Sequence, residues 1–307
     1  GLSFAQFSNE LYQIMTMTYN REVSDDPYIH VLSYFVGSVL GAPSLFFVFV
    51  SFIYAYFFAG SLFRLFQIFP KPQFSKLFFG FALVFLLWKN IEGINTVRTW
   101  TGLWILFYGA LSYYQTKKKK YLLLMFVPPL IHIGYLAMAL PAWGVVFLGV
   151  RRWIYAAIFF MSFSTTLINP PAIAEKLGES DVGASKVQGY YVEEEQTLQD
   201  AIDMSKGKTW YKTMFTIGVQ NWGIVLIATS LIVFGAYFGK MTELEAHLFS
   251  IGILTKAFSN MTWFLYAVSN RSGLIAGVFI LATLLLMWQR GYFKQKKKMV
   301  KWQNRTL

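Results

Sequence analysis

Long apolar stretches separated by short polar turns run through most of the chain. They lie at residues 43–66, 74–92, 97–116, 121–150, 153–169, 213–239, 246–268 and 273–290. About 20 apolar residues are needed for an α-helix to cross the hydrocarbon core of a bilayer. The pattern therefore predicts an all-α, polytopic integral membrane protein.

The 121–150 stretch has 30 residues and is too long for one untilted span. Its backbone hydrogen bonding is interrupted at Pro128, Pro129, Gly134 and Pro141. We predict two short helices here, which meet near Ile131 to Tyr135. The total is then nine transmembrane helices in a single transmembrane domain over residues 1–307.

The composition supports a membrane protein and excludes several classes of enzyme. Hydrophobic residues make up 56% of the chain and charged residues 14%, against about 25% charged in soluble proteins. The chain has no Cys, which excludes disulfides and thiolate metal or redox sites. It also lacks a P-loop, HExxH, GxSxG or a pair of intramembrane carboxylates. We expect no metal and no cofactor.

The charged residues predict the orientation of the spans. One set of connections, including Lys117–Lys120 and the tail from Arg290, holds 17 Lys and Arg residues and two acids. The opposite set, including the first 30 residues and the 170–212 loop, holds nine basic and 13 acidic residues. The first set is predicted to be cytoplasmic because basic loops stay inside. The net charge of +12 then reflects topology, and we expect no nucleic-acid partner.

Two segments are predicted to lie on the outer face of the membrane. Residues 1–42 form an outer-face segment, in which the apolar run of 12 residues that begins at Ile29 and stops at Gly41 is too short to span and predicts a re-entrant or interfacial helix. Residues 170–212 form an extracytoplasmic loop, which we interpret as a lid. Because an outer N-terminus at Gly1 has no initiating Met or signal peptide, we expect an upstream helix, and the C-terminal end leaves room for further spans.

Ionisable residues within or beside the spans are costly and therefore point to function. Arg98 begins a span six residues after Glu92. It is either an interfacial anchor, or a salt-bridge partner of Glu92, or an anion clamp. The clamp is favoured because the N-terminus of a helix attracts anions and the hydroxyls of Thr99 and Thr101 lie beside it.

Five further positions have less specific contexts. His132 lies at the predicted helix break and is either a packing residue or a group that transfers a proton. Arg271, in a predicted outer turn, is equally an anchor or an anion-binding residue. Lys256, within a predicted span, could snorkel or pair with a carboxylate, and its role stays open. His30 and His247 lie in turn-like contexts and are expected to be solvated.

An outward-facing site of Arg and His residues suits a diphosphate-bearing substrate whose apolar tail lies in the bilayer. The Arg residues would stabilise the departing diphosphate, and His132 would handle a hydroxyl proton.

Four sequence patterns resemble the EpsG/Wzy family of polysaccharide polymerases. They are DDPYIHVLSYFVG, VRTWTGLWILFYGALSYYQTKKKKYLLLMF, PPLIHIGYL and SNRSG, and the similarity runs from about Glu10 to Phe293. The most distinctive feature is the order of an Arg, a Lys cluster and then a His. Arg98, His132 and Arg271 match positions at which the family often carries Arg, His and Arg. The chain departs from the family after Arg271, where an aromatic residue is often found.

The resemblance implies metal-independent, inverting glycosyl transfer at the outer face of the bacterial inner membrane, which joins undecaprenyl-diphosphate-linked oligosaccharide repeat units. It also implies a GT-C-like architecture and a chain-length regulator as partner, beside membrane lipid. Arg98 and Arg271 would hold the donor diphosphate, and His132 would orient or deprotonate the acceptor hydroxyl. Glu92 or Asp26 could serve as the base instead.

Aromatic residues such as Tyr28 and Trp100 could stack on sugar faces, although packing in the membrane belt is the more common role of such side chains. Two other functions use similar residues. A flippase for lipid-linked saccharides would bind the diphosphate without making or breaking covalent bonds. It needs a pathway lined by charged residues that are accessible from both faces of the membrane. A membrane acyltransferase that modifies sugars needs a route for its acyl donor, and the sequence shows none.

Overall fold

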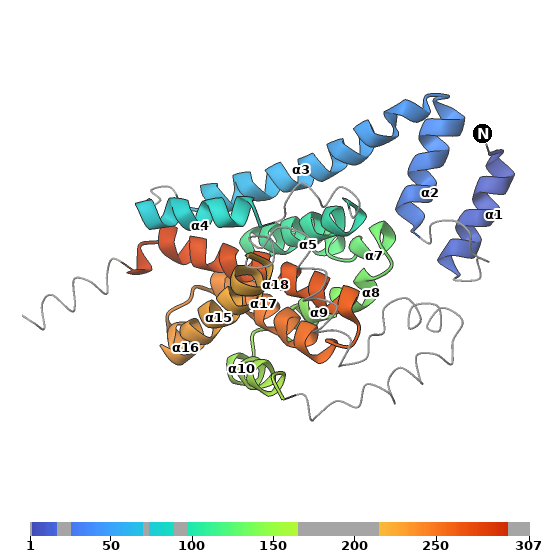
Figure 1. Ribbon diagram of the computed structural model, residues 1–307. Helices are drawn as coiled ribbons and strands as arrows, with labels where there is room; N and C mark the ends of the chain where they lie inside the picture. The colour runs from blue at the N-terminus through green and yellow to red at the C-terminus, as the bar shows by residue number, and fades with distance from the viewer. Residues whose placement is uncertain (1, 17–25, 70–73, 89–96, 165–214, 294–307) are drawn as a thin grey trace, which may run out of the picture. The chain divides into compact units, whose positions relative to one another are not determined.

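The computed structural model describes residues 2–16, 26–69, 74–88, 97–164 and 215–293 (Figure 1). Within these ranges every extended element of regular structure is helical and no β-strand occurs. The prediction of an all-α fold is therefore confirmed for the described part of the chain. The predicted lid at 170–212 and the residue Glu92 lie outside it.

The contacts divide the chain into two compact units. The first comprises Gly1–Arg64 and Ile91–Trp143, and the second comprises Leu65–Asn90 and Gly144–Leu307. Two of the three boundaries fall within the helices α3 and α9. Each unit is described separately below.

The first unit contains ten helical elements in its described part, counting the two that continue into the second unit. They are α1 (Phe4–Met15), α2 (Pro27–Tyr34), the π-helix η1 (Phe35–Val39), the 3-10 helix η2 (Pro43–Leu45), α3 (Phe46–Gln67), α5 (Val97–Thr116), α6 (Lys119–Leu124), α7 (Pro128–Ile131), α8 (Tyr135–Met138) and α9 (Leu140–Leu148).

Helix α1 was not predicted, although its start has a recognisable signal. The Ser3 hydroxyl accepts a hydrogen bond from the Gln6 backbone N–H, and the Gln6 side chain accepts one from the Ser3 N–H. This reciprocal pair is a capping box, which marks a helix N-terminus. Helix α1 packs against α2, where the Phe7 ring stacks on Tyr34 with centroids 4.1 Å apart.

The expectation that His30 and His247 lie in turns is wrong, because both lie in helices, and His30 is buried rather than solvated. His30 lies in α2 and is buried, with its ring stacked on Phe7 and its Nε2 atom 3.3 Å from the Phe7 carbonyl oxygen. His247 lies in the first turns of a long helix, where its Nδ1 atom is 2.7 Å from the Glu243 carbonyl oxygen. Both side chains therefore make local structural contacts.

The short apolar run after Pro27 is helical, as predicted. Helix α2 continues into η1, and the chain turns at Gly41, whose φ of +63° is a left-handed conformation that glycine adopts without strain. Pro43 then begins the next helical segment. The run thus ends at the predicted residue.

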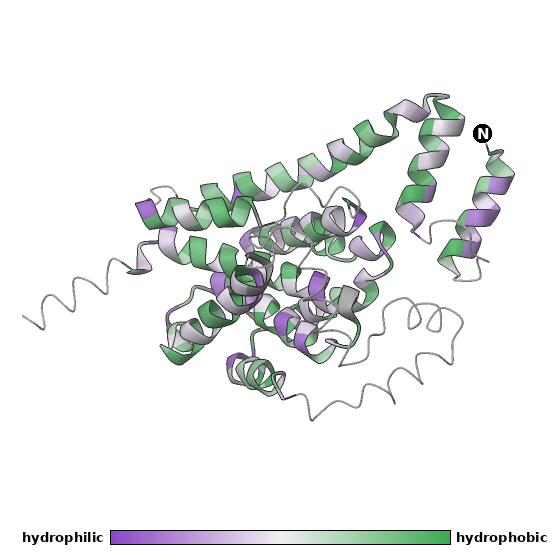
Figure 2. Ribbon diagram, in the orientation of Figure 1, coloured by the Kyte–Doolittle hydropathy of each residue, from purple (hydrophilic) through white to green (hydrophobic). Residues whose placement is uncertain are grey.

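Two helices in the described ranges are long and apolar enough to cross a membrane, Pro43–Gln67 and Val268–Gln289. The first exposes large apolar side chains such as Phe47, Phe52 and Phe63, and Figure 2 shows mainly hydrophobic colouring along α3. The second is almost completely buried by its neighbours. Several other predicted spans correspond to shorter helices, so the structure does not confirm the number nine.

The described part of the second unit is built around two long helices. Its elements are α4 (Lys76–Leu86), α10 (Arg152–Met161), the π-helix η5 (Phe215–Gly223), α15 (Ile224–Val233), α16 (Ala236–Gly239), α17 (Glu243–Met261) and α18 (Tyr266–Gln289). Helices α17 and α18 pack along each other, and α4, α15 and η5 contact α18.

Close packing and one ion pair stabilise this unit. A Cβ atom at Gly277 would overlap the Trp88 ring, whose Nε1–H donates to the Leu274 carbonyl oxygen at 2.9 Å. Arg290 binds the buried carboxylate of Glu245 through two hydrogen bonds, of 3.0 and 2.9 Å. Because Glu245 lies at the start of α17 and Arg290 follows α18, this pair joins the two helices at one end.

Candidate functional site

The predicted helix break in the first unit is confirmed at His132. Helix α7 begins at Pro128, and His132 follows it with an extended backbone (φ −154°, ψ 119°) before α8 begins. The 121–150 stretch forms four short helices rather than the predicted two, because its prolines and glycines interrupt the backbone hydrogen bonds more than once. The break leaves backbone groups that must find partners elsewhere.

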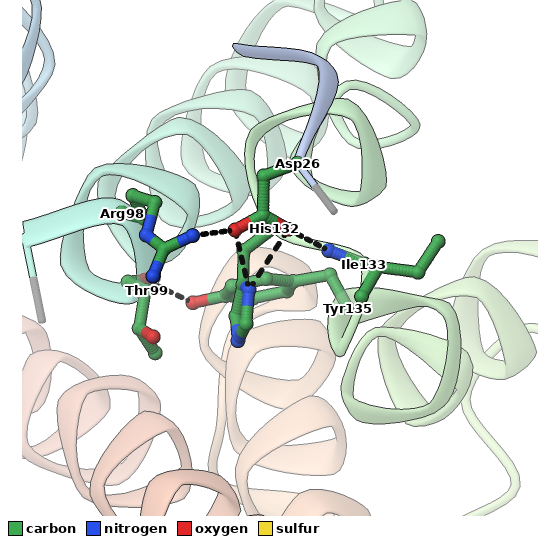
Figure 3. Close-up of polar contacts among 6 residues, drawn as sticks. All are labelled: Asp26, Arg98, Thr99, His132, Ile133 and Tyr135. Carbon is green, nitrogen blue, oxygen red and sulfur yellow. Dashed lines mark hydrogen bonds and ion pairs between the residues drawn. The ribbon is translucent and has the colours of Figure 1, made fainter. Parts of the chain in front are cut away.

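Asp26 supplies one of these partners. Its Oδ1 atom accepts a hydrogen bond of 2.9 Å from the Ile133 backbone N–H. Asp26 directly precedes Pro27, the first residue of α2, but its side chain makes no capping bond to that helix. The carboxylate instead points toward the break between α7 and α8 (Figure 3).

The same carboxylate orients the imidazole of His132. The Nδ1 atom of His132 lies 3.2 Å from both Oδ1 and Oδ2 of Asp26. A carboxylate in this position favours the tautomer in which Nδ1 carries the proton and donates it. The Nε2 atom is then the proton acceptor. A Cβ atom at Gly134 would lie 3.2 Å from Nε2, which is closer than an ordinary van der Waals contact. Glycine at position 134 therefore leaves space beside Nε2 of His132.

Arg98 completes the cluster from the first turn of α5. Its Nη1 atom forms an ion pair with Oδ2 of Asp26 (Figure 3). The Asp26 side chain is 2% exposed and the Arg98 side chain 36% exposed. Arg98 thus pairs with Asp26, whereas the sequence analysis considered Glu92. The buried carboxylate anchors a guanidinium that still reaches the surface.

The electrostatic surroundings keep Asp26 ionised. Burial alone would raise the pKa of this carboxyl group. The hydrogen bond and charge of His132, the Ile133 N–H and the charge of Arg98 act in the opposite direction and hold its pKa below the ordinary value. A carboxylate that is this well satisfied is a weak base, so its geometry suits positioning His132 better than accepting a proton.

A second contact holds the two sides of the cluster together. The Tyr135 hydroxyl donates a hydrogen bond of 2.6 Å to the Thr99 carbonyl oxygen, and both residues are buried. Tyr135 begins α8, three residues after His132, and Thr99 follows Arg98. The tyrosine therefore fixes the backbone beside His132 to the backbone beside Arg98.

The other predicted substrate contacts in this unit lie in the interior. Thr99, Trp100 and Thr101 are buried, and the Thr101 hydroxyl donates to the Val97 carbonyl oxygen at 2.8 Å. Tyr28 packs against the apolar cluster of α2, and burial raises its pKa to about 12. In this structure these side chains pack within the first unit, and their role in substrate binding stays a prediction.

The remaining candidates belong to the second unit. Arg271 lies half-buried in α18, within a helix rather than in the predicted turn, and Lys256 is buried in α17. The structure thus brings Asp26, Arg98 and His132 together and places Arg271 in the other unit. Among the residues that it describes, no three His, Asp or Glu side chains are grouped as metal ligands would be, and no metal site is assigned.

The role of Asp26 was only partly anticipated. The sequence analysis named it as one of two alternative bases, whereas the structure gives it contacts with both other members of the site. These partners lie 72 and 106 residues away in the chain. The Asp-Pro start of a helix is the only local signal, and it does not reveal such distant partners.

Comparison of the chain with protein-family models, with curated proteins and with solved structures finds no match.

The lowered pKa of Asp26 predicts how the stability of the fold depends on pH. The carboxylate stabilises the fold above its unfolded pKa of about 3.9, and this contribution is lost as the pH falls through the lower folded-state value. Near neutral pH we expect Asp26→Asn to reduce the free energy of unfolding by about 2 kcal/mol, typical of hydrogen bonds to charged groups. The difference in the free energy of unfolding between the wild type and Asp26→Asn should become smaller below about pH 4.

Thermal unfolding of the purified wild type and of Asp26→Asn between pH 7 and pH 3 measures this difference in stability. Glu243→Gln, at an exposed acid in α17, serves as a control that should change little. A difference of constant size across the whole pH range would contradict the assignment of Asp26 as the stabilising carboxylate.

Proposed function

We propose that this protein is a polysaccharide polymerase, a glycosyltransferase that joins undecaprenyl-diphosphate-linked oligosaccharide repeat units. The observation that carries the proposal is the cluster of the first unit, where a buried carboxylate orients His132 and pairs with a partly exposed Arg98. A base with a fixed tautomer beside a cation that suits phosphate is the combination that this transfer needs. The resemblance to the EpsG/Wzy family agrees with it.

In the proposed reaction, Nε2 of His132 removes the proton from the acceptor hydroxyl. The hydroxyl oxygen attacks the anomeric carbon of the donor, and the bond from that carbon to the diphosphate oxygen breaks with inversion. Arg98 stabilises the negative charge that develops on the leaving diphosphate. Asp26 stabilises the imidazolium that forms, so its role is positioning and electrostatic. No metal takes part.

The proposal places the protein in the bacterial inner membrane with its site facing outside. The apolar, exposed surface of α3 and the length of α18 support membrane spans. Nine spans, a GT-C-like arrangement and contact with a chain-length regulator follow from the charge pattern and the family resemblance. The 1–42 segment would then lie at the outer membrane surface and bring Asp26 to the site.

Polymer-length analysis tests the function directly. Purified protein is supplied with a lipid-diphosphate repeat unit in the presence of a chelator, and the products are separated by size. A ladder of lengthened products is expected. Movement of lipid-linked units between leaflets without lengthening would replace the polymerase by a flippase, and transfer of an acyl group to the saccharide would replace it by an acyltransferase.

Arg98→Lys separates an anion clamp from an interfacial anchor. Lysine keeps the charge and can still pair with Asp26, but it lacks the planar fork that binds two phosphate oxygens. We expect the rate of polymer formation to fall by about tenfold or more, since the loss of one charge-assisted hydrogen bond amounts to about 1.5–3 kcal/mol. Arg151→Lys, at an exposed arginine, is the matched control. Near-normal polymer from Arg98→Lys at normal expression would identify Arg98 as an anchor.

His132→Gln tests the base. Glutamine can hydrogen bond to Asp26 but cannot take a proton, so we expect the rate to fall by about 10²- to 10⁴-fold, the usual contribution of a general base. His247→Gln provides the control. If His132→Gln polymerises at the wild-type rate, the base is another group, such as Glu92 or Asp26.

A further inference from the structure

One end of the first unit gathers basic side chains that the proposed reaction does not use. Four consecutive lysines, Lys117–Lys120, lie at the connection between α5 and α6, and all four are exposed. Arg64, in the last turn of α3, contacts this connection, because its Nη2 atom donates a hydrogen bond of 2.7 Å to the hydroxyl of Tyr121 in α6. We refer to Arg64 and Lys117–Lys120 as the basic end.

Two tyrosine rings hold the guanidinium of Arg64 in place. Its Cζ atom lies 5.0 Å from the ring centroid of Tyr108 in α5 and 4.9 Å from that of Tyr121. The Nζ atom of Lys120 lies 5.2 Å from the centroid of the same Tyr121 ring. Because the face of an aromatic ring attracts cations, Tyr121 brings a cation of α3 and a cation of α6 together.

Glycines allow the three helices to approach closely enough for these contacts. A Cβ atom at Gly60, one turn before Arg64, would lie 3.1 Å from Cε2 of Tyr108. A Cβ atom at Gly109 would lie 3.1 Å from the carbonyl oxygen of Tyr121. Both distances are shorter than an ordinary van der Waals contact. The positions of Arg64 and Tyr121 therefore follow from the close packing of α3, α5 and α6.

The backbone of the lysine connection is strained. Lys117 has a φ of +57° and is the only non-glycine residue with a positive φ in the part of the chain that the structure describes. Glycine is the usual residue at such a position after a helix, because a Cβ atom makes the left-handed conformation unfavourable. The connection thus presents a lysine side chain where glycine would be less strained, and strain of this kind is frequent at functional sites.

Apolar side chains beside the basic end face outward. Phe63, which precedes Arg64, is 64% exposed, and Leu123 in α6 is 67% exposed. Arg64 follows Phe46 by 18 residues, which is about 27 Å along α3. The hydrocarbon core of a bilayer is about 30 Å thick. In a bilayer that α3 crosses, the exposed apolar side chains therefore meet the acyl chains, and the basic end lies at the level of the lipid headgroups.

We propose that the basic end binds the headgroup of an anionic phospholipid, whose acyl chains lie along the exposed apolar surface of α3. The planar guanidinium of Arg64 suits two oxygens of the lipid phosphate. Lys118 and Lys119 attract the net negative charge of the headgroup. The sequence predicts Lys117–Lys120 to be cytoplasmic, and the cytoplasmic leaflet carries anionic lipids. The site belongs to the first unit and does not depend on the polymerase reaction.

Direct lipid binding by the full chain in a non-ionic detergent tests this site. The immobilised protein is titrated with mixed micelles that contain radiolabelled phosphatidylglycerol, and the retained lipid is counted. Phosphatidylcholine is the neutral reference, and inorganic pyrophosphate is added as a competitor. Lys118→Gln/Lys119→Gln removes two charges from the basic end. Arg151→Gln/Lys240→Gln, at two exposed basic residues of the second unit, removes the same number of charges elsewhere.

We expect the wild type to bind phosphatidylglycerol more tightly than phosphatidylcholine. Lys118→Gln/Lys119→Gln should weaken the binding of phosphatidylglycerol by about 25-fold, since each lysine beside an anionic headgroup contributes about fivefold. Arg151→Gln/Lys240→Gln should change it little. Arg64→Lys should weaken it by about tenfold, because lysine keeps the charge but lacks the planar fork.

Equal affinity for the two lipids, or equal weakening by the two double variants, would overturn the proposal. Pyrophosphate that binds more tightly than phosphatidylglycerol would assign the basic end to a free phosphate instead of a lipid. If Arg64→Lys fails to fold, Lys118→Gln/Lys119→Gln still decides, because both of its side chains are exposed. Activity is not used as a readout, so this result is separate from the outcome of the polymer assay.

Discussion

The buried carboxylate of Asp26 is the interaction on which the site depends. It binds the backbone N–H of Ile133, the imidazole of His132 and the guanidinium of Arg98, which come from different parts of the first unit. A buried charge is tolerated only when it is paired and hydrogen bonded. The three partners satisfy this requirement. Their contacts with the carboxylate also hold the three groups close to one another.

The helix break is the structural condition for this arrangement. A continuous helix would use the Ile133 N–H internally, and His132 would then project from a regular helical surface. The extended backbone at His132 releases that N–H toward Asp26 and turns the imidazole toward the same carboxylate. The prolines of the 121–150 stretch thus create a polar site within an otherwise apolar segment.

The sequence allowed the helical class and the break to be predicted, and it identified Arg98 and His132 as candidates, because hydrophobic length, proline and isolated charges are local signals. The pairing of Arg98 with Asp26 was not predictable, because Asp26 is 72 residues away in the chain. Helix α1 was missed although Ser3 and Gln6 form a recognisable capping box. The burial of Lys256 depends on which side chains surround α17, and only the structure provides that information.

A double-mutant cycle in the polymer assay tests most directly whether Asp26 acts through His132. Asp26→Asn, His132→Gln and the double variant are compared with the wild type at equal amounts of folded protein. If the two residues act as one unit, the double variant should be no slower than His132→Gln alone, because the positioning of an absent base has no further effect. Rate losses that multiply in the double variant would contradict the account, since they would show that Asp26 and His132 contribute independently.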